Sequence, residues 1–132
     1  MKYLLDTNVF IDLLRNGNES IRDRLASVGI NECCISDITQ YELMVGALYS
    51  TNPEEETERL DKICEMFKIL RHSDYVKASV RQKEYLKGIG KMIPDFDIFI
   101  GTAAVENGLI IVSGDKHMDC LKNAVVEDWK LP

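Results

Sequence analysis

The stretch YLLDTNVFIDLL, residues 3–14, decides the fold, because a short apolar run meets an acid and then continues directly as a helical pattern. Residues 3–5 form an unbroken apolar run, which is typical of a strand buried on both faces. The run ends at Asp6, and Thr7 and Asn8 suit the entry to a helix. A strand that leads at once into a helix is the first half of a strand–helix–strand unit, so the stretch predicts a parallel sheet covered by helices.

The rest of the chain repeats this alternation of short apolar runs and helical segments. Further strands are predicted at residues 33–36, 68–71, 109–112 and 124–126, and helices at residues 20–28, 37–49, from 53 onward, 74–89, 95–106 and 116–121. The pattern predicts an α/β fold: a three-layer α/β/α sandwich with a mainly parallel sheet of four to five strands. The length of 132 residues suits a single domain, residues 1–132.

Composition narrows the class of protein. No apolar run approaches the ~20 residues of a membrane helix, and the N-terminus reaches an acid at its sixth residue, so it does not read as a signal peptide. We therefore expect a cytoplasmic protein. The four cysteines form no C-x-x-C pair, which argues against a zinc site. The net charge of −6 weighs against a nucleic-acid partner. The segment from Lys68 to Lys91, however, contains seven basic residues and only two acids, so the net charge of the whole chain conceals a basic segment.

Two acids stand where parallel α/β folds place their sites. Asp6 ends the first predicted strand, and Asp115 follows the clearest one, residues 109–112. Ligands bind such sheets at the carboxyl ends of the strands, so both carboxylates are expected at that edge. Each acid taken alone could equally be a helix cap.

Glu42 and Asp97 carry more weight because of their neighbours. Glu42 aligns at helical spacing with Ile38 and Val45, on or beside the predicted buried stripe, where an unpaired carboxylate would cost several kcal/mol. It therefore needs a Lys or Arg partner, or a metal ion shared with other acids. Small residues one and two turns after Asp97 would let its helix pack closely on the sheet. Asp95 points roughly 160° away on the same helix, so we interpret Asp95 as the cap and Asp97 as the ligand.

Four converging carboxylates would repel one another, and a hard divalent cation such as Mg²⁺ or Mn²⁺ would relieve that repulsion. A cation held in this way suits phosphodiester hydrolysis, because it activates an attacking water and stabilises charge on the phosphate. The sequence contains no G-x-S-x-G or Walker A pattern that would indicate another chemistry.

With these acids in these positions, the sequence resembles the PIN-domain ribonucleases, and among them the VapC toxins of toxin–antitoxin pairs. Four segments carry the resemblance, in family order and over nearly the whole chain: LLDTNVFID with Asp6, ISDITQYELMVGA with Glu42, DIFIGTAAVENGL with Asp97, and IIVSGDKHM with Asp115. The departures are minor, since Gly101 stands where alanine is commoner and Ser113 where threonine is commoner. Neither change removes a ligand.

The resemblance implies a role for each matching position. Asp6, Glu42 and Asp97 match the acidic triad that holds the metal, and Asp115 matches a more variable fourth acid. Thr7, Asn8 and Ser113 match the polar positions that orient a ligand, a water or a metal-bound acid. The resemblance further implies an Mg²⁺- or Mn²⁺-dependent endoribonuclease that forms a homodimer. A cognate antitoxin, whose C-terminal segment lies across the site, is expected to inhibit it.

The basic segment supports an RNA partner independently of the resemblance. On a helix from residue 74, the bases fall within an arc of roughly 160°, and we expect four of them to contact RNA phosphates: Lys77, Arg81, Lys83 and Lys87. The same residues could instead form an ordinary solvated face. Val76 and Val80, which interrupt the basic side, could mark a dimer surface.

Two other functions remain open. A phosphatase-like α/β hydrolase of the haloacid type would need D-x-D after the first strand, but this chain has Asp6-Thr7-Asn8 there. A catalytically silent RNA-binding or scaffold domain would be favoured by an incomplete set of acids, whereas this set is complete.

Overall fold

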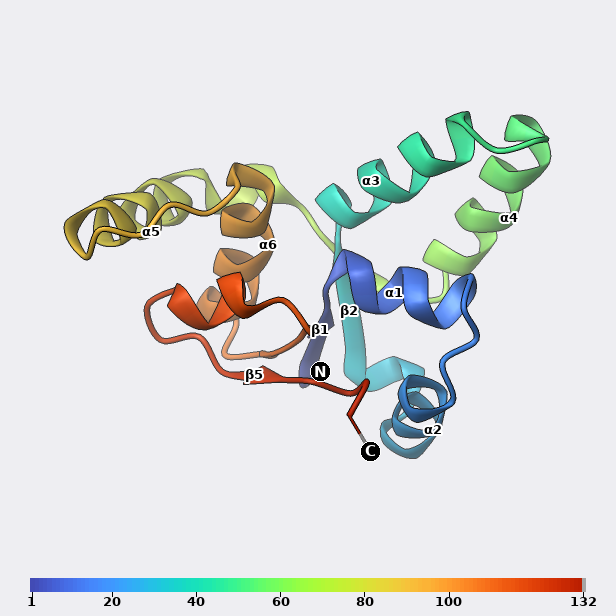
Figure 1. Ribbon diagram of the computed structural model, residues 1–132, viewed down its shortest axis with the longest axis horizontal. Helices are drawn as coiled ribbons and strands as arrows, with labels where there is room; N and C mark the ends of the chain where they lie inside the picture. The colour runs from blue at the N-terminus through green and yellow to red at the C-terminus, as the bar shows by residue number, and fades with distance from the viewer. Residues whose placement is uncertain (132) are drawn as a thin grey trace.

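A central strand, β1, organises the whole sheet (Figure 1). The computed structural model describes residues 1–131, which form one five-stranded sheet in the order β3-β2-β1-β4-β5 with every neighbouring pair parallel. The strands are β1 (Tyr3–Leu5), β2 (Cys33–Ser36), β3 (Lys68–Leu70), β4 (Ile110–Val112) and β5 (Val126–Glu127). The prediction of a parallel sheet with four to five strands is confirmed.

Helices cover both faces of this sheet, so the three-layer prediction is also confirmed. They are α1 (Thr7–Leu14), α2 (Glu19–Val28), α3 (Asp37–Leu48), α4 (Pro53–Cys64), α5 (Val76–Gly88) and α6 (Asp95–Glu106), with 3₁₀ turns η1 (Ile30–Glu32), η2 (His72–Tyr75) and η3 (Lys116–Cys120). Side chains of β1 alternate between the two cores, with Leu5 packed in the cluster that contains Phe10 and Trp129, and Leu4 in the cluster that contains Leu86 and Ile98. Figure 1 shows α1 and α2 on one side of β1 and α5 and α6 on the other.

Three details differ from the sequence expectations. Helical spacing predicts an apolar stripe of Ile38, Tyr41, Val45 and Leu48 on α3, but only Ile38 of these is buried, and Tyr41 and Leu48 are exposed. The other buried residues of α3 form one row, Thr39, Leu43 and Ala47. The buried row turns toward α1 and α4 because α3 packs against both of these helices. The segment before α5 forms the 3₁₀ turn η2, so the α-helix begins at Val76. Asp95 does not cap α6: the N-cap is Pro94, and the Asp95 carboxylate pairs with a lysine instead.

No helix within residues 1–131 is both long enough and apolar enough to cross a membrane.

Candidate metal centre

The four candidate acids come from four separate segments and meet at one edge of the sheet. Asp6 follows β1 and Asp115 follows β4, while Glu42 lies in α3 after β2 and Asp97 lies in the first turn of α6. Because all the strands are parallel, the segments that follow them leave the sheet at the same edge. The acids are close enough for their charges to interact, with Asp97 and Asp115 acting on Asp6 and Glu42 acting on Asp97.

Asp6 is the most deeply buried of the four. It is 3% exposed, and its two oxygens are held separately: the backbone N–H of Thr7 donates to Oδ1 at 2.8 Å, and the hydroxyl of Ser113 donates to Oδ2 at 2.8 Å. The pKa of Asp6 is raised from 3.8 to about 6, chiefly by burial and to a lesser extent by the charges of Asp97 and Asp115, against the lowering effect of the two hydrogen bonds. The carboxylate is thus fixed in position, but its two hydrogen bonds do not fully offset the cost of burying its negative charge.

Glu42 is held by the hydroxyl of one threonine rather than by a base, and a second threonine contacts the first. The hydroxyl of Thr7 donates to Glu42 Oε1 at 2.7 Å and lies 2.9 Å from the hydroxyl of Thr39, which is buried one turn before Glu42 on α3. The predicted apolar stripe does not form around Glu42, since its side chain is half-buried beside this hydroxyl pair. Thr7 therefore connects the two sides of the site, because its backbone binds Asp6 and its side chain binds Glu42.

Asp97 and Asp115 face each other across the imidazole of His117. The Nδ1 atom of His117 lies 3.6 Å from Asp97 Oδ2 and 3.4 Å from Asp115 Oδ1. Burial raises the pKa of Asp97, and so do the charges of Asp115 and Glu42, while His117 lowers it. Asp115 also caps η3 by accepting a hydrogen bond from the backbone N–H of His117 at 2.9 Å, and its own N–H donates to Ser113 Oγ at 2.9 Å.

Two residues at this site were not singled out from the sequence. Thr39 lies three residues before Glu42, on nearly the same face of α3, and this spacing could have indicated it. His117 lies two residues after Asp115, and only the tight η3 turn brings its ring back over the acids. A prediction of an ordinary short α-helix at residues 116–121 gave no reason to expect that return.

The set of side chains fits a bound divalent cation. In the part of the chain that the structure describes, the only basic group within 4.0 Å of these four carboxylates is His117. Four carboxylates and one imidazole are donors that a divalent cation accepts, and a cation would offset the charge that burial leaves uncompensated. Asp97, Asp115 and His117 can each offer one ligand atom within 4.8 Å of the others.

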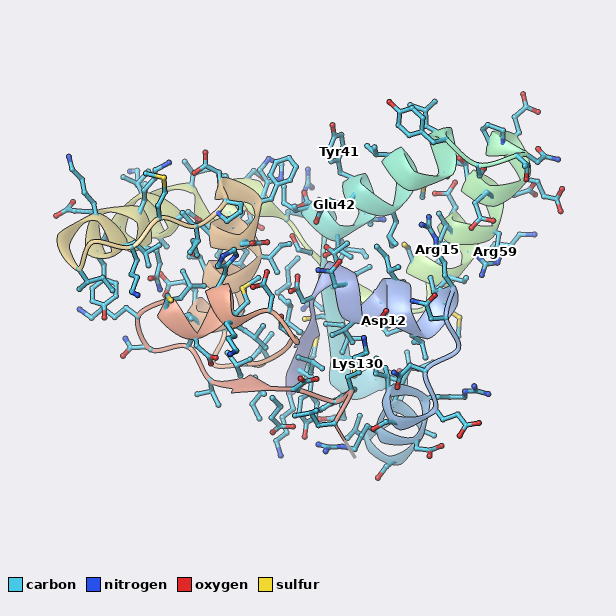
Figure 2. The ribbon with its side chains drawn as sticks, in the orientation of Figure 1. Asp12, Arg15, Tyr41, Glu42, Arg59 and Lys130 are labelled. Atoms are coloured by element: carbon cyan, nitrogen blue, oxygen red, sulfur yellow. The ribbon has the colours of Figure 1, made fainter. Side chains whose placement is uncertain are left out.

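Of the predicted RNA-contacting residues, the structure brings Thr7, Ser113 and Asn8 to the acidic centre, and the four bases of α5 contact none of its acids in the residues that the structure describes. Asn8 is exposed and helps to line a cavity of about 460 Å³ that also touches Asp115 and ends at the ion pair between Lys130 and Asp12. In Figure 2, Glu42 lies on α3 near the start of α1, Asp12 lies farther along α1, and Lys130 of the C-terminal segment lies beside Asp12. The four predicted bases of α5 are all exposed: Lys77, Arg81, Lys83 and Lys87.

Two of the four α5 bases already pair with acids of α6. Lys83 Nζ lies 2.6 Å from Asp95 Oδ1, and an Arg81 nitrogen lies 3.5 Å from Glu106 Oε1. Asp95 is two residues before Asp97 but points to another side of α6, so Lys83 is held outside the acidic cluster. Glu106, at the other end of α6, lies about 14 Å along the helix axis from Asp97.

A parallel sheet with clustered carboxylates at its carboxyl edge defines a class of α/β proteins that bind metal there. The chain belongs to the PIN-domain family, whose sequence profile matches residues 3–123, and within that family to the VapC ribonucleases. It is 32% identical to ribonuclease VapC2 of Haemophilus influenzae over 87% of each chain, and 27% identical to the tRNA(fMet)-specific endonuclease VapC of Salmonella typhimurium over 98% of each.

Solved structures agree with this assignment. The VapBC complex of Salmonella typhimurium bound to DNA contains a chain with a TM-score of 0.89 at 27% identity, covering 98% of both chains. FitAcB from Neisseria gonorrhoeae gives 0.86 at 28% identity, covering 98% of this chain and 99% of that one.

Proposed function

We propose that this chain is a metal-dependent endoribonuclease and the toxin of a VapBC pair, with residues 1–132 acting as one nuclease domain. The observation that carries the proposal is the meeting of four carboxylates from four segments without a Lys or Arg near them in residues 1–131. We assign Asp6, Glu42, Asp97 and Asp115 as catalytic residues that hold the metal. Mg²⁺ or Mn²⁺ suits these oxygen donors.

The chemistry divides between the ion and the chain. When bound, the cation supplies an activated water and stabilises the charge that develops on the phosphate. The chain orients the carboxylates: Thr7 and Ser113 fix the two oxygens of Asp6, and Thr7 also fixes Glu42. These hydrogen bonds form within the chain alone, so they orient Asp6 and Glu42 before substrate binds.

Incubation of the purified chain with RNA tests the activity directly. We expect cleavage in Mg²⁺ or Mn²⁺ and none after treatment with EDTA, with activity restored by adding back the metal. Initiator tRNA is the first substrate to try, because one relative is a tRNA(fMet)-specific endonuclease, and sequencing of the cleaved ends would define the target. Cleavage that persists in EDTA would contradict the proposal, as would the absence of cleavage of total cellular RNA in either metal.

The basic face of α5 is proposed as a phosphate-binding wall, formed by Lys77, Arg81, Lys83 and Lys87. Lys83 pairs with Asp95 at the start of α6, and Lys87 lies one turn later on α5. We expect Lys83→Gln with Lys87→Gln to weaken RNA binding about 10-fold and to reduce the slope of its salt dependence by up to ~2. Lys62→Gln, an exposed base on α4, is the matched control. Equal binding by the double variant and the control would identify an ordinary solvated face.

Two protein partners are also proposed, a cognate antitoxin and a second copy of this chain. Similar solved chains come from VapBC toxin–antitoxin complexes. Val76 and Val80 are about half exposed on α5, and an exposed edge-to-face pair of Tyr41 and Phe96 lies beside the acidic site. Exposed apolar groups of this kind favour protein contacts. Light scattering of the chain alone, and with the product of an adjacent reading frame, would give the masses of both assemblies.

A further inference from the structure

We propose that His117 is a nitrogen ligand of the metal at this site, bound together with Asp97 and Asp115, and that it raises the affinity for Mn²⁺ relative to Mg²⁺. The inference deepens the proposed function and rests on its metal centre. It assigns a ligand outside the set of four acids.

The position of the imidazole carries the proposal. His117 Nδ1 lies 3.6 Å from one carboxylate oxygen and 3.4 Å from another, on two different segments of the chain. Both distances are longer than an N–H···O hydrogen bond of about 2.7–3.2 Å. Neighbouring ligand atoms around one octahedral cation at about 2.1 Å are separated by about 3 Å. Small side-chain rotations would therefore bring all three atoms onto one ion.

The local backbone holds the ring in this place. The η3 turn follows Asp115 directly, and the N–H of His117 donates to Asp115 Oδ1 at 2.9 Å. Asp97 comes from the first turn of α6, which packs against η3. Gly101, one turn after Asp97, permits that packing, because a Cβ there would lie 2.0 Å from the Leu121 side chain and 3.3 Å from Met118 Sδ. The histidine and both acids are therefore positioned by one packed junction.

The chemistry of the donor predicts a preference among metals. Mg²⁺ favours an all-oxygen environment and retains its waters, whereas imidazole is a better ligand for later first-row ions. A nitrogen donor should thus strengthen binding of Mn²⁺ more than binding of Mg²⁺. The other two acids already accept hydrogen bonds from Thr7 and Ser113, whereas Asp97 and Asp115 are the acids that His117 approaches.

Pulsed electron paramagnetic resonance of bound Mn²⁺ tests the ligand itself. We expect ¹⁴N coupling from one imidazole in the wild-type protein, absent in His117→Gln and retained in His72→Gln. His72 is the matched control, since it is the only other histidine and pairs with Asp37 at 2.9 Å. Incorporation of ¹⁵N-histidine into the wild-type chain should replace the ¹⁴N pattern without any substitution, so the test does not depend on how a variant folds.

Titration calorimetry supplies the second measurement. We expect His117→Gln to weaken Mn²⁺ binding by about 10-fold to 100-fold and Mg²⁺ binding by less than about 3-fold, with His72→Gln unchanged for both. Bound Mn²⁺ without ¹⁴N coupling would overturn the histidine ligand and leave the metal centre intact. A wild-type protein that binds neither ion would overturn the metal centre and, with it, this proposal. Equal losses for the two metals would overturn the preference.

Discussion

The Asp97→Asn variant is expected to lose metal-dependent RNA cleavage by a factor on the order of 10³ or more while keeping its fold. The substitution preserves the shape of the side chain but removes a charge that faces Asp115 and His117. Loss of a directly coordinating, charge-stabilising group costs catalysis several kcal/mol in comparable sites. Burial opposes ionisation of Asp97, so the neutral amide should not destabilise the folded chain.

Cleavage rates of the two proteins at saturating Mg²⁺, with circular dichroism to monitor the fold, would measure this effect. Asp95→Asn is the matched control, because Asp95 lies two residues away on the same helix and pairs with Lys83 outside the acidic cluster. We expect the control to retain cleavage within about 3-fold of wild type. Unchanged cleavage by Asp97→Asn would remove this residue from the site.

The Asp6→Asn variant is expected to be more stable than wild type in metal-free buffer at neutral pH. The folded protein holds the Asp6 proton more tightly than the unfolded chain, since the pKa rises from 3.8 to about 6. Stability is therefore lost as pH rises from about 4 to about 6, by up to about 3 kcal/mol, and stays low above that range. Asparagine does not ionise and can keep an acceptor for the Thr7 N–H, so it avoids this loss.

Denaturant unfolding in EDTA at pH 4 and pH 7.5 would test the sign of the effect. We expect the two proteins to be similar at pH 4 and the variant to be about 2–3 kcal/mol more stable at pH 7.5. Saturating Mg²⁺ should stabilise wild type and abolish or reverse the difference, because binding to the folded state adds its own free energy. Asp23→Asn, on the exposed face of α2, controls for net charge. A variant that is less stable at pH 7.5 would contradict the assignment of Asp6 as an uncompensated buried charge.

Sequence patterns predicted the sheet well because its strands are buried on both faces. A short apolar run such as residues 3–5 or 110–112 is best explained as a buried strand, and the turn residues between the runs limit where each strand can begin and end. The same reasoning placed Asp6 and Asp115 at the carboxyl edge, where the structure has them. The resemblance to PIN-domain ribonucleases then supplied roles that burial and spacing alone left open.

The helices were predicted less well because their neighbours decide which face is buried. Tyr41 suits a core position by its chemistry, yet it stacks on Phe96 at the surface, while the small polar Thr39 is fully buried. Asp95 looked like a cap, but an exposed lysine on α5 takes its carboxylate. His117 could not be predicted as a site residue from the sequence, because its approach to Asp97 depends on how η3 packs against α6. Packing between segments that are distant in sequence decides which helix face is buried and which side chains meet, and sequence patterns contain no information on that packing.

The place of β1 in the sheet also sets when the enzyme can exist during its own synthesis. β1 can pair with β2 once residue 36 has been made, but its other edge stays open until β4 has been translated. Ser113, which holds Asp6, and Asp115 and His117 follow only after that. The nascent chain therefore carries Asp6 and Glu42 long before they can be assembled with Asp115. A ribosome making this protein can meet a functional nuclease only after β4 and the segment through His117 have been made.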